Sequence, residues 1–158
     1  RRTLTITILE MDKNQWIIDN LPYSDPFRFV DKISNIDEES VEGSYHFHKD
    51  HDFYKGHFKN NPITPGVILS ECMAQIGVVS LGIYLLRDQD IEGLEIGLTS
   101  ISADYYIPVF PDETLIVKSE KKYFRFNKLK CLCKMYNEDE KLVCKAEIAG
   151  MLKIEKDD

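Results

Sequence analysis

A histidine and a glutamate in the middle of the chain have the residue types and the spacing for acid–base chemistry. Glu71 is the only charged side chain in the apolar stretch 67–86, and a carboxylate in such a stretch must be paired, neutral or beside a cavity. Desolvation raises a carboxyl pKa towards the value that a general acid needs near neutral pH. His57 lies in the loop before this stretch, and imidazole is a common general base. The pair predicts proton transfer without a metal.

Each of the two residues also has a simpler interpretation. Glu71 would be stabilised at an exposed helix start by the positive end of the helix dipole. His57 would be a loop histidine that is hydrogen-bonded to the backbone. Both interpretations stay open for each residue taken alone, but a loop histidine followed by a glutamate early in the next helix is a plausible acid–base couple.

The segment Pro-Ile-Thr-Pro-Gly-Val, residues 62–67, separates the two side chains. Thr64 is a suitable N-cap, and Pro65 suits the first helical turn. If the helix starts here, the amides of Gly66 and Val67 point outward at its positive end, where they can polarise a carbonyl as an oxyanion hole does. The alternative is an ordinary Pro-Gly turn.

Several histidines gather in His-Phe-His-Lys-Asp-His, residues 46–51. His46 and His48 share one face of a predicted strand, and His51 and Asp52 follow. Histidines two positions apart on a strand can bind a metal ion. The alternative is a solvated strand face, where polar residues are the default.

Basic residues alternate with aromatic residues in the segment 121–130. The interpretations are nucleic-acid binding, an exposed strand face, or a docking patch for an acidic partner protein that includes Lys121, Lys122 and Arg125. The chain has 20 Lys and Arg against 27 Asp and Glu, a formal charge of −7. This balance argues against binding to phosphate backbones and to anionic lipid surfaces.

The stretch 67–86 must be the helix that positions these groups. It is long and apolar enough to span a membrane, but it also fits a helix that is buried on nearly every face inside a soluble domain. Glu71 would be costly in lipid, and Gln75 and two serines dilute the run. We therefore expect a core helix and no membrane span.

Strand periodicity surrounds this helix on both sides, which predicts an α+β protein rather than a doubly wound one. We expect a single domain over residues 1–158, with residues 1–20 as an N-terminal strand or extension. The predicted strands occupy residues 3–8, 26–48, 96–107, 114–126, 130–136 and 141–152, with a short helix over 12–20 and a long loop over 49–66.

The four cysteines do not form a Cys-x-x-Cys pair. We expect reduced, packed thiols and a cytoplasmic protein. The four are Cys72, Cys131, Cys133 and Cys144.

Three segments resemble a known family. Gly-His-Phe-Lys-Asn-Asn-Pro-Ile-Thr-Pro-Gly-Val-Ile-Leu-Ser-Glu-Cys-Met-Ala-Gln, residues 56–75, resembles the signature of the β-hydroxyacyl-acyl carrier protein dehydratases of bacterial fatty acid synthesis. Residues 21–33 are similar to that family's opening segment, and residues 101–115 to its later strand-turn motif. The resemblance covers roughly residues 20–150.

The resemblance implies a hotdog fold, in which a curved antiparallel sheet wraps a long central helix. It also implies a homodimer, which in some members assembles further into a trimer of dimers, with His57 of one subunit acting beside Glu71 of the other. The substrate would be a (3R)-3-hydroxyacyl chain on acyl carrier protein, and the product a trans-2-enoyl thioester. Neither a metal nor an organic cofactor is required.

The same resemblance implies roles for the residues. His57 would take the C2 proton, the Gly66 and Val67 amides would hold the thioester oxygen, and Glu71 would hold or protonate the departing hydroxyl. An apolar tunnel would take the acyl chain. Its expected wall residues are Phe58, Ile63, Ile68 and Tyr106.

The chain departs from the family pattern around the catalytic pair. Tyr23-Ser24-Asp25 replaces His-Arg-Tyr, Lys59-Asn60 replaces Pro-Gly, and Tyr105 and Tyr106 replace basic residues. These changes suit a dehydratase for a specialised polyene or polyketide-like lipid as well as one for fatty acids. The alternatives are an acyl thioesterase of the same fold and a non-catalytic acyl-binding subunit.

Overall fold

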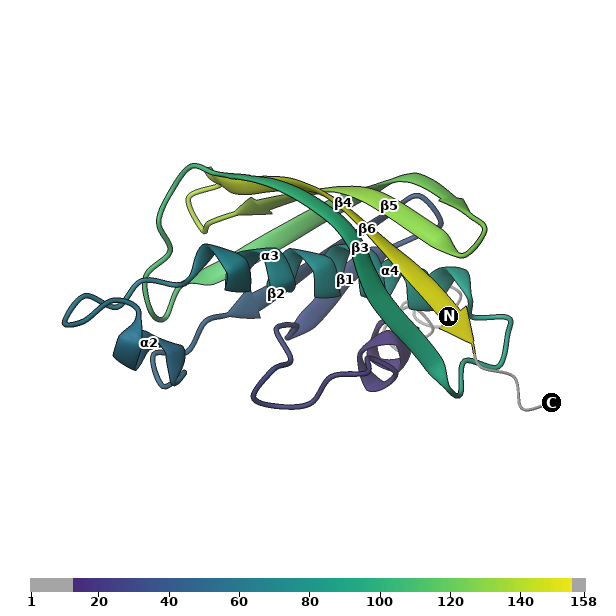
Figure 1. Cartoon of the computed structure of the whole chain (residues 1–158), viewed down its shortest axis with the longest axis horizontal. Coiled ribbons are helices and arrows are strands. Elements are labelled where there is room, and N and C mark those ends of the chain that lie inside the picture. The colour runs from purple at the N-terminus through teal and green to yellow at the C-terminus, as the bar shows by residue number, and fades with distance from the viewer. Residues whose placement is uncertain (1–12, 155–158) are drawn as a thin grey trace, which may run out of the picture.

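A single antiparallel sheet arches over one long helix (Figure 1). The computed structural model describes residues 13–154, so the strand predicted over residues 3–8 lies outside the described residues. The strand order is β1-β2-β4-β5-β6-β3. The strands are β1 (Lys32–Ile36), β2 (Ser40–His46), β3 (Leu94–Tyr105), β4 (Thr114–Arg125), β5 (Lys128–Tyr136) and β6 (Leu142–Ile154). The predicted α+β layout is confirmed.

Strict alternation in β2 and β5 shows which face of the sheet covers the core. In β2, Val41, Gly43 and Tyr45 are buried while the residues between them are half-buried, and β5 alternates in the same way along its whole length. Period-two burial places one face of the sheet on the core and leaves the other in contact with solvent. The buried face is the one that covers the helix.

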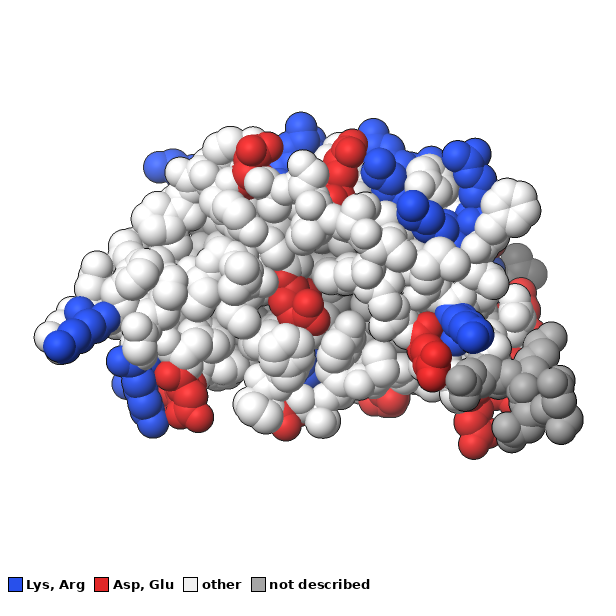
Figure 2. All heavy atoms as spheres, viewed as in Figure 1, with Lys and Arg blue, Asp and Glu red and all other residues white. Residues whose placement is uncertain are grey.

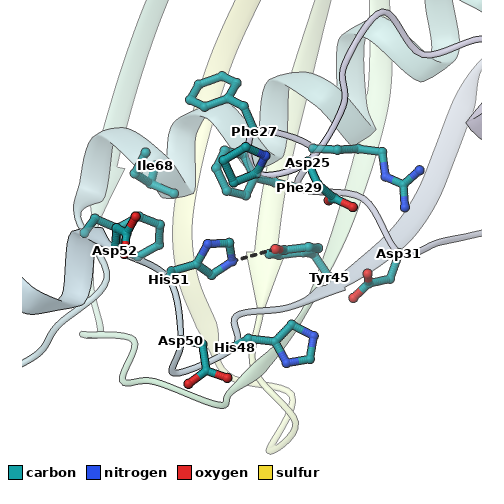
Figure 3. Close-up of a pocket in the computed structure, with 13 residues that line it drawn as sticks. Asp25, Phe27, Phe29, Asp31, Tyr45, His48, Asp50, His51, Asp52 and Ile68 are labelled. Atoms are coloured by element: carbon teal, nitrogen blue, oxygen red, sulfur yellow. Dashed lines mark hydrogen bonds between the residues drawn. The ribbon is translucent and has the colours of Figure 1, made fainter.

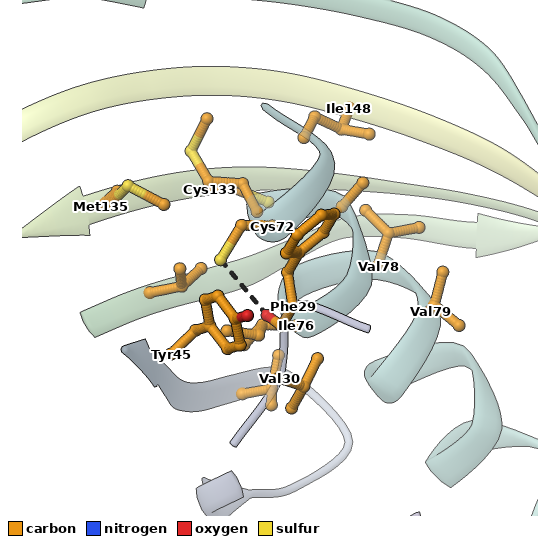
Figure 4. Packing of buried hydrophobic residues seen from close by; sticks show 14 of the residues in the cluster. Phe29, Val30, Tyr45, Cys72, Ile76, Val78, Val79, Cys133, Met135 and Ile148 are labelled. Carbon is orange, nitrogen blue, oxygen red and sulfur yellow. Dashed lines mark hydrogen bonds between the residues drawn. The ribbon is translucent and has the colours of Figure 1, made fainter. Parts of the chain in front are cut away.

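The central helix runs without interruption from Gly66 to Leu85 and consists of α3 (Gly66–Ala74), a π-helical segment η1 (Gln75–Val79) and α4 (Ser80–Leu85). It is long and apolar enough to cross a membrane, but 78% of its most apolar window is buried inside the protein. Figure 4 shows its side chains packed against those of the sheet. This supports the core helix over the membrane span.

The helix lies close against the sheet at Gly77. A Cβ atom there would lie 2.5 Å from the Cys133 sulfur and 3.0 Å from the Ser119 Cβ, so only glycine fits. The wider π-helical turn occurs at this point, where the Ser119 hydroxyl donates to the Gly77 carbonyl at 2.9 Å and the Ser80 hydroxyl to the Gln75 carbonyl at 2.9 Å. These side chains satisfy carbonyls in the segment where the regular hydrogen-bond ladder changes.

Two sequence predictions need correction. Residues 26–31 do not belong to a strand, because the amide and carbonyl groups of Phe29 bond to Gln75 and Cys72 of the helix instead of a neighbouring strand. The N-cap position is Pro65, with no side-chain cap. Thr64 does not cap the helix, since its hydroxyl lies 2.5 Å from the buried Tyr54 hydroxyl.

The long loop is present, with its own internal structure. It contains the short helix α2 (Phe53–Gly56) and projects from one end of the molecule (Figure 1). The amide of Thr64 donates to the Val109 carbonyl at 2.8 Å, which ties the end of this loop to the β3–β4 connection before the central helix begins.

Strand β3 differs from the other long strands because it is exposed on both sides. Every residue from Gly97 to Ser102 is exposed, including Leu98 at 50% and Ile101 at 45%. β3 is also the last strand of the sheet, so within residues 13–154 its outer edge has no strand partner. Apolar edge strands of this length pair with other chains unless they are protected.

The cysteines are packed as predicted. All four are free and buried, and burial raises the pKa of Cys133 and of Cys144 to about 12. A thiol with a pKa this high is neutral at physiological pH and is a poor nucleophile.

Candidate active site

His57 stands at the end of the short helix α2, and its ring is oriented by the loop that follows. Its amide donates to the Phe53 carbonyl at 3.0 Å, and its own carbonyl accepts from the Ile63 amide at 2.9 Å. Nδ1 lies 2.8 Å from the Ile63 carbonyl oxygen. Since a carbonyl only accepts, Nδ1 carries the proton and Nε2 is left as the acceptor nitrogen. The backbone-bonded interpretation is therefore correct, and it leaves the ring in the tautomer that a general base needs.

The half-buried His57 ring lines a hollow of about 300 Å³. We call it the His57 hollow. Its other walls come from the start of the central helix and from the β3–β4 connection: Ile63, Thr64, Gly66, Leu69, Tyr105, Tyr106, Ile107, Pro108 and Val109. It therefore combines one titratable nitrogen, one helix start and a largely apolar wall.

α3 begins at the edge of this hollow, which Gly66 lines, whereas Val67 lines a neighbouring hollow that contains Glu71. Helical hydrogen bonding starts with the Ile68 and Leu69 amides, which both donate to the Pro65 carbonyl. The Gly66 and Val67 amides precede them and are among the groups at a helix start that have no intrahelical acceptor. Gly66 packs closely on Tyr105: a Cβ atom there would lie 3.2 Å from the Tyr105 ring, which would have to shift by a few tenths of an ångström. The site thus offers amide donors for a developing negative charge.

Glu71 lies further along the same helix and is held by Gln75. The Gln75 amide nitrogen donates to Glu71 Oε1 at 3.0 Å and to the Phe27 carbonyl at 2.9 Å. The Gln75 amide oxygen accepts from the Phe29 amide at 2.7 Å. Gln75 is fully buried, so three hydrogen bonds fix it and it in turn fixes the carboxylate.

Tyr23 is a second neighbour of Glu71. Burial and, to a smaller extent, the negative charge of Glu71 together raise the pKa of Tyr23 to about 12. The phenol is therefore neutral at physiological pH and remains a hydrogen-bond donor beside the carboxylate. It occupies the first position of the Tyr23-Ser24-Asp25 departure described above.

Glu71 lines a hollow of about 370 Å³ that is separate from the His57 hollow. We call it the Glu71 hollow, and its other walls are Val67, Ser70, Leu98, Ile101, Ala103 and Tyr105. Val67 is 75% exposed, and apolar groups of β3 form much of the wall. The middle of the face in Figure 2 is correspondingly uncharged, apart from an isolated acidic group. The Glu71 hollow is an open, apolar surface around one carboxylate.

Tyr105 lines both hollows. Its ring lies against Gly66, and its hydroxyl is hydrogen-bonded to the Ser70 hydroxyl. Ser70 is 7% exposed, so this bond holds the tyrosine against the helix between the two hollows. Within one chain, His57 and Glu71 therefore face different spaces on either side of one aromatic ring.

The expected tunnel residues do not share one space. Ile63 and Tyr106 line the His57 hollow. Ile68 lines a third cavity of about 630 Å³ beneath the loop. Phe58 is 54% exposed, and its ring stacks on His57 at a centroid distance of 3.9 Å.

The third cavity contains His51, which has a structural partner (Figure 3). His51 Nε2 lies 2.7 Å from the Tyr45 hydroxyl, and the imidazole stacks on Phe53 with an interplanar angle of 12°. Burial lowers the pKa of His51. His48 and Asp52 line the same cavity as His51 but have other neighbours. Asp52 pairs with Lys55 at 3.1 Å, and the rings of His46 and His48 have centroids 4.6 Å apart.

The basic residues expected to dock a carrier lie far from His57. Lys and Arg side chains gather at the end of the molecule where the β4–β5 hairpin lies (Figure 2). The other end of β4 follows the β3–β4 connection that lines the His57 hollow. Lys121 is paired with Glu39 at 3.3 Å. Lys122 and Arg125 are exposed, and the Arg125 guanidinium lies 4.5 Å from the centre of the Tyr123 ring.

Sequence reasoning missed four residues of the site: Gln75, Tyr23, Ser70 and Tyr105. Gln75 was detectable, because side chains four positions apart on a helix face each other and glutamine pairs well with an acid at that spacing. Ser70 lies on the same helix, next to Glu71, but its partner Tyr105 comes from β3. Tyr23 and Tyr105 are distant in sequence from the helix, and no local pattern links them to Glu71 or Gly66.

A family model and individual relatives both match most of this chain. The family model of the FabA-like domain matches residues 21–147. A 3-hydroxyacyl-[acyl-carrier-protein] dehydratase FabZ of Brucella melitensis biotype 2 is 34% identical over 152 residues, covering 94% of this chain and 93% of that protein. The FabZ of Anaplasma phagocytophilum is 32% identical over 151 residues, covering 91% of this chain and 99% of that protein.

Solved structures share the fold. The dehydratase heterocomplex ApeI:P from Xenorhabdus doucetiae matches with a TM-score of 0.73 at 10% identity, covering 87% of this chain and 90% of that chain. A hypothetical thioesterase with coenzyme A from Streptococcus pneumoniae TIGR4 matches with a TM-score of 0.57 at 16% identity, covering 79% and 87%. The expected hotdog fold, a sheet wrapped around a central helix, is confirmed.

Proposed function

The chain belongs to the FabA-like family, and on that premise we propose that it dehydrates (3R)-3-hydroxyacyl thioesters on acyl carrier protein to trans-2-enoyl thioesters. The observation that carries the proposal is the orientation of His57. Its Nδ1–H is committed to the Ile63 carbonyl, so Nε2 is free to accept a proton beside the amides that begin α3. A base next to an oxyanion site is what removal of a proton α to a thioester requires.

In the proposed reaction His57 Nε2 takes the C2 proton. The electron pair of that C–H bond forms the C2–C3 double bond, and the C3–O bond breaks. The carboxyl group of Glu71 gives its proton to the departing hydroxyl, which leaves as water. The imidazolium and the carboxylate then exchange a proton through solvent, so no redox step or cofactor is involved.

The Gly66 and Val67 amides would hold the thioester oxygen while negative charge develops on it. Preorganised amide donors stabilise such charge by several kcal/mol, about 2.7–4 kcal/mol for each donor. Gln75 positions Glu71 rather than acting on the substrate, because its amide is fully buried and all its bonds go to protein groups. Tyr23 adds a neutral donor beside the carboxylate.

We propose that the complete site forms between two copies of the chain, with His57 from one protomer and Glu71 from its partner. His57 and Glu71 line different hollows, and the Glu71 hollow opens beside the unpaired strand β3. Pairing of two β3 strands would bury Leu98 and Ile101 and bring a second His57 hollow towards Glu71. This supports a homodimer, and a trimer of dimers remains part of the proposal.

The acyl chain is proposed to extend from the His57 hollow past Ile63 and Tyr106, with Phe58 and Ile68 as further wall residues. The carrier is proposed to dock on Lys121, Lys122 and Arg125. The pathway that uses the enoyl thioester would end in a fatty acid or in a more specialised polyene or polyketide-like lipid, and the reaction would take place in the cytoplasm. The thioesterase alternative shares the fold alone with this chain, and the non-catalytic subunit is disfavoured by the preserved catalytic pair.

A substrate assay tests the reaction. The protein is incubated with 3-hydroxybutyryl and crotonyl thioesters of acyl carrier protein, and enoyl, hydroxyacyl and free thiol products are measured. We expect interconversion of the two thioesters without thiol release. His57→Ala and Glu71→Gln should each lower turnover at least about 100-fold, whereas Glu120→Gln on the exposed side of β4 should not. Release of free thiol would support the thioesterase instead.

Mixing the two inactive variants tests the shared site. A mixed dimer of His57→Ala and Glu71→Gln chains has one site with both native side chains if the site is shared, and none if it lies within one chain. After random exchange of subunits, about a quarter of the wild-type activity should return. Subunit exchange without recovery of activity would refute the shared site while leaving the dehydratase assignment intact.

Charge reversal at Lys122 and Arg125 tests docking. It should weaken carrier binding in a salt-dependent way without changing turnover of a short thioester that lacks the carrier. Unchanged carrier affinity would show that the carrier docks elsewhere. Charge reversal at the exposed Lys59, two positions after His57, is the comparison variant for docking near the His57 hollow.

A further inference from the structure

Three side chains that can ligate a metal ion meet at one point of the surface, outside the proposed catalytic site. His46 is the last residue of β2, His48 follows it by two positions, and Asp112 comes from the β3–β4 connection. Their ligand atoms all lie within 4.8 Å of one another. His46 Nε2 and Asp112 Oδ1 are 3.5 Å apart. The two histidines are neighbours because they lie two positions apart in an extended segment. Asp112 is distant in sequence and reaches them only through the folding of the β3–β4 connection.

The His46 ring is already oriented for ligation through Nε2. Its Nδ1 lies 2.8 Å from the Thr114 hydroxyl, which is its partner across the β2–β4 pair. An Nδ1–H that donates to this hydroxyl leaves the Nε2 lone pair directed at Asp112. A hydrogen bond on the far nitrogen fixes the ring and the tautomer of metal-binding histidines in the same way.

Asp112 is held as firmly as His46. Its carboxylate accepts from the Lys49 amide at 3.0 Å, and its own amide donates to the Phe47 carbonyl at 2.6 Å. Its φ angle of 68° lies in the left-handed region, so the surrounding turn determines where its side chain points. Two of the three ligands are therefore positioned by contacts outside the cluster.

We propose that His46, His48 and Asp112 bind a divalent transition-metal ion, with Zn²⁺ as the best fit. Tetrahedral Zn²⁺ with ligands at about 2.0–2.1 Å separates them by about 3.4 Å, close to the separation of His46 Nε2 from Asp112 Oδ1. The ligand atoms now lie up to 4.8 Å apart. His48 is exposed, so rotation of its side chain can bring its ring nitrogen to the ligand separation that Zn²⁺ needs. Two imidazoles and one carboxylate favour Zn²⁺ and its neighbours over Ca²⁺ or Mg²⁺, which prefer oxygen ligands.

The site would act as a clamp rather than as part of catalysis. It would join the end of β2 to the β3–β4 connection, which supplies the Val109 carbonyl to the Thr64 amide and one wall of the His57 hollow. In Figure 3, His51 points at Tyr45 and His48 lies apart from that contact, so His48 is free to ligate. Binding to the folded chain alone would raise its stability.

Zinc titration of the untagged full chain tests the proposal. Zn²⁺ alone is added in competition with a chromophoric chelator, and Co²⁺ is added separately to record its visible absorption. We expect one ion per chain, a tetrahedral Co²⁺ spectrum and a higher unfolding temperature with Zn²⁺. His48→Ala and Asp112→Asn should each weaken Zn²⁺ affinity at least about tenfold and abolish the temperature shift.

Asp50→Asn is the matched control, because it removes the same charge from an exposed residue beside His48 without removing a ligand. It should bind Zn²⁺ as the wild type does. Unfolding without metal checks that each variant is folded. The proposal fails if the wild type binds no Zn²⁺ at tens of micromolar, or if folded His48→Ala and Asp112→Asn both bind as tightly as the control.

Discussion

The two sides of Tyr105 are built in different ways. On the His57 side, hydrogen bonds within the chain close the site: the imidazole bonds to the Ile63 carbonyl, the Thr64 hydroxyl to Tyr54, and the Thr64 amide to Val109. On the Glu71 side, one glutamine holds the carboxylate, and the remaining wall is the exposed apolar face of Val67 and β3. The His57 side is thus held by hydrogen bonds within one chain, whereas the Glu71 side has a wall of exposed apolar side chains from the edge strand β3.

This difference indicates where the site is divided. Loops carry function when a rigid scaffold positions them, and the loop that carries His57 is rigid through its own bonds. An open apolar face next to an unpaired strand edge instead indicates an interface. The comparison therefore predicts that changes on the Glu71 side act through assembly, whereas changes on the His57 side act within one chain.

The strongest test places charges on the open side. Leu98→Lys combined with Ile101→Lys should separate the subunits, because two lysines on each β3 would face each other across the interface. Activity should fall at least about 100-fold, as each His57 loses its partner carboxylate. Light scattering after size-exclusion chromatography measures the mass, and the thioester assay measures turnover. Phe126→Lys in the β4–β5 turn, where the phenylalanine is 93% exposed, should change neither mass nor turnover.

The start of α3 tests the boundary between the two sides. In Gly66→Ala the new methyl group would lie 3.2 Å from the Tyr105 ring, so the ring must move by a few tenths of an ångström away from the amides. We expect turnover to fall about tenfold, equivalent to about 1.4 kcal/mol, with the subunit mass unchanged. Gly56→Ala is the matched control, since a Cβ atom there meets nothing within 4 Å. Equal turnover in the two variants would show that the contact with Tyr105 does not matter.

A smaller effect is expected from the hydroxyl pair that holds Tyr105. Tyr105→Phe removes the bond to Ser70 and should lower the free energy of unfolding by about 1 kcal/mol. Ser70→Ala should cost a similar amount, and the double variant should cost less than the sum if the two hydroxyls act as a pair. Chemical denaturation of all four proteins measures this coupling. Simple additivity would mean that the bond contributes little in solution.

The smallest expected effect is a pH dependence of the unfolding temperature that arises from His51, in the loop that also carries His57. Burial lowers the pKa of His51 from 6.5, so just below that pH the unfolded chain binds more protons at this residue than the folded chain does. The unfolding temperature should therefore fall as the pH drops below about 6.5. His51→Gln should flatten that decline relative to the wild type. Parallel pH profiles for the two proteins would contradict this role of His51.

Much of the fold could be predicted because its signals are local. Alternation predicted β4 and β5 to within a few residues, and the apolar stretch after Pro65 predicted the central helix. The prediction failed at residues 26–31, where Phe29 bonds to Gln75 rather than to a strand. It also failed at Thr64, whose hydroxyl binds a distant tyrosine. In both cases a tertiary hydrogen bond replaced the local pattern.

The sequence by itself determined the chemistry that is available: His57, a glycine at a helix start, and Glu71 on an apolar helix. Residue types and short spacings carry that information, because helices and strands have fixed periods. Only the tertiary structure decided the tautomer of His57, the placement of Tyr105 between the two hollows and the meeting of His46 with Asp112. Each of these depends on segments that are distant in sequence, and only the packing of the sheet around the helix brings them together.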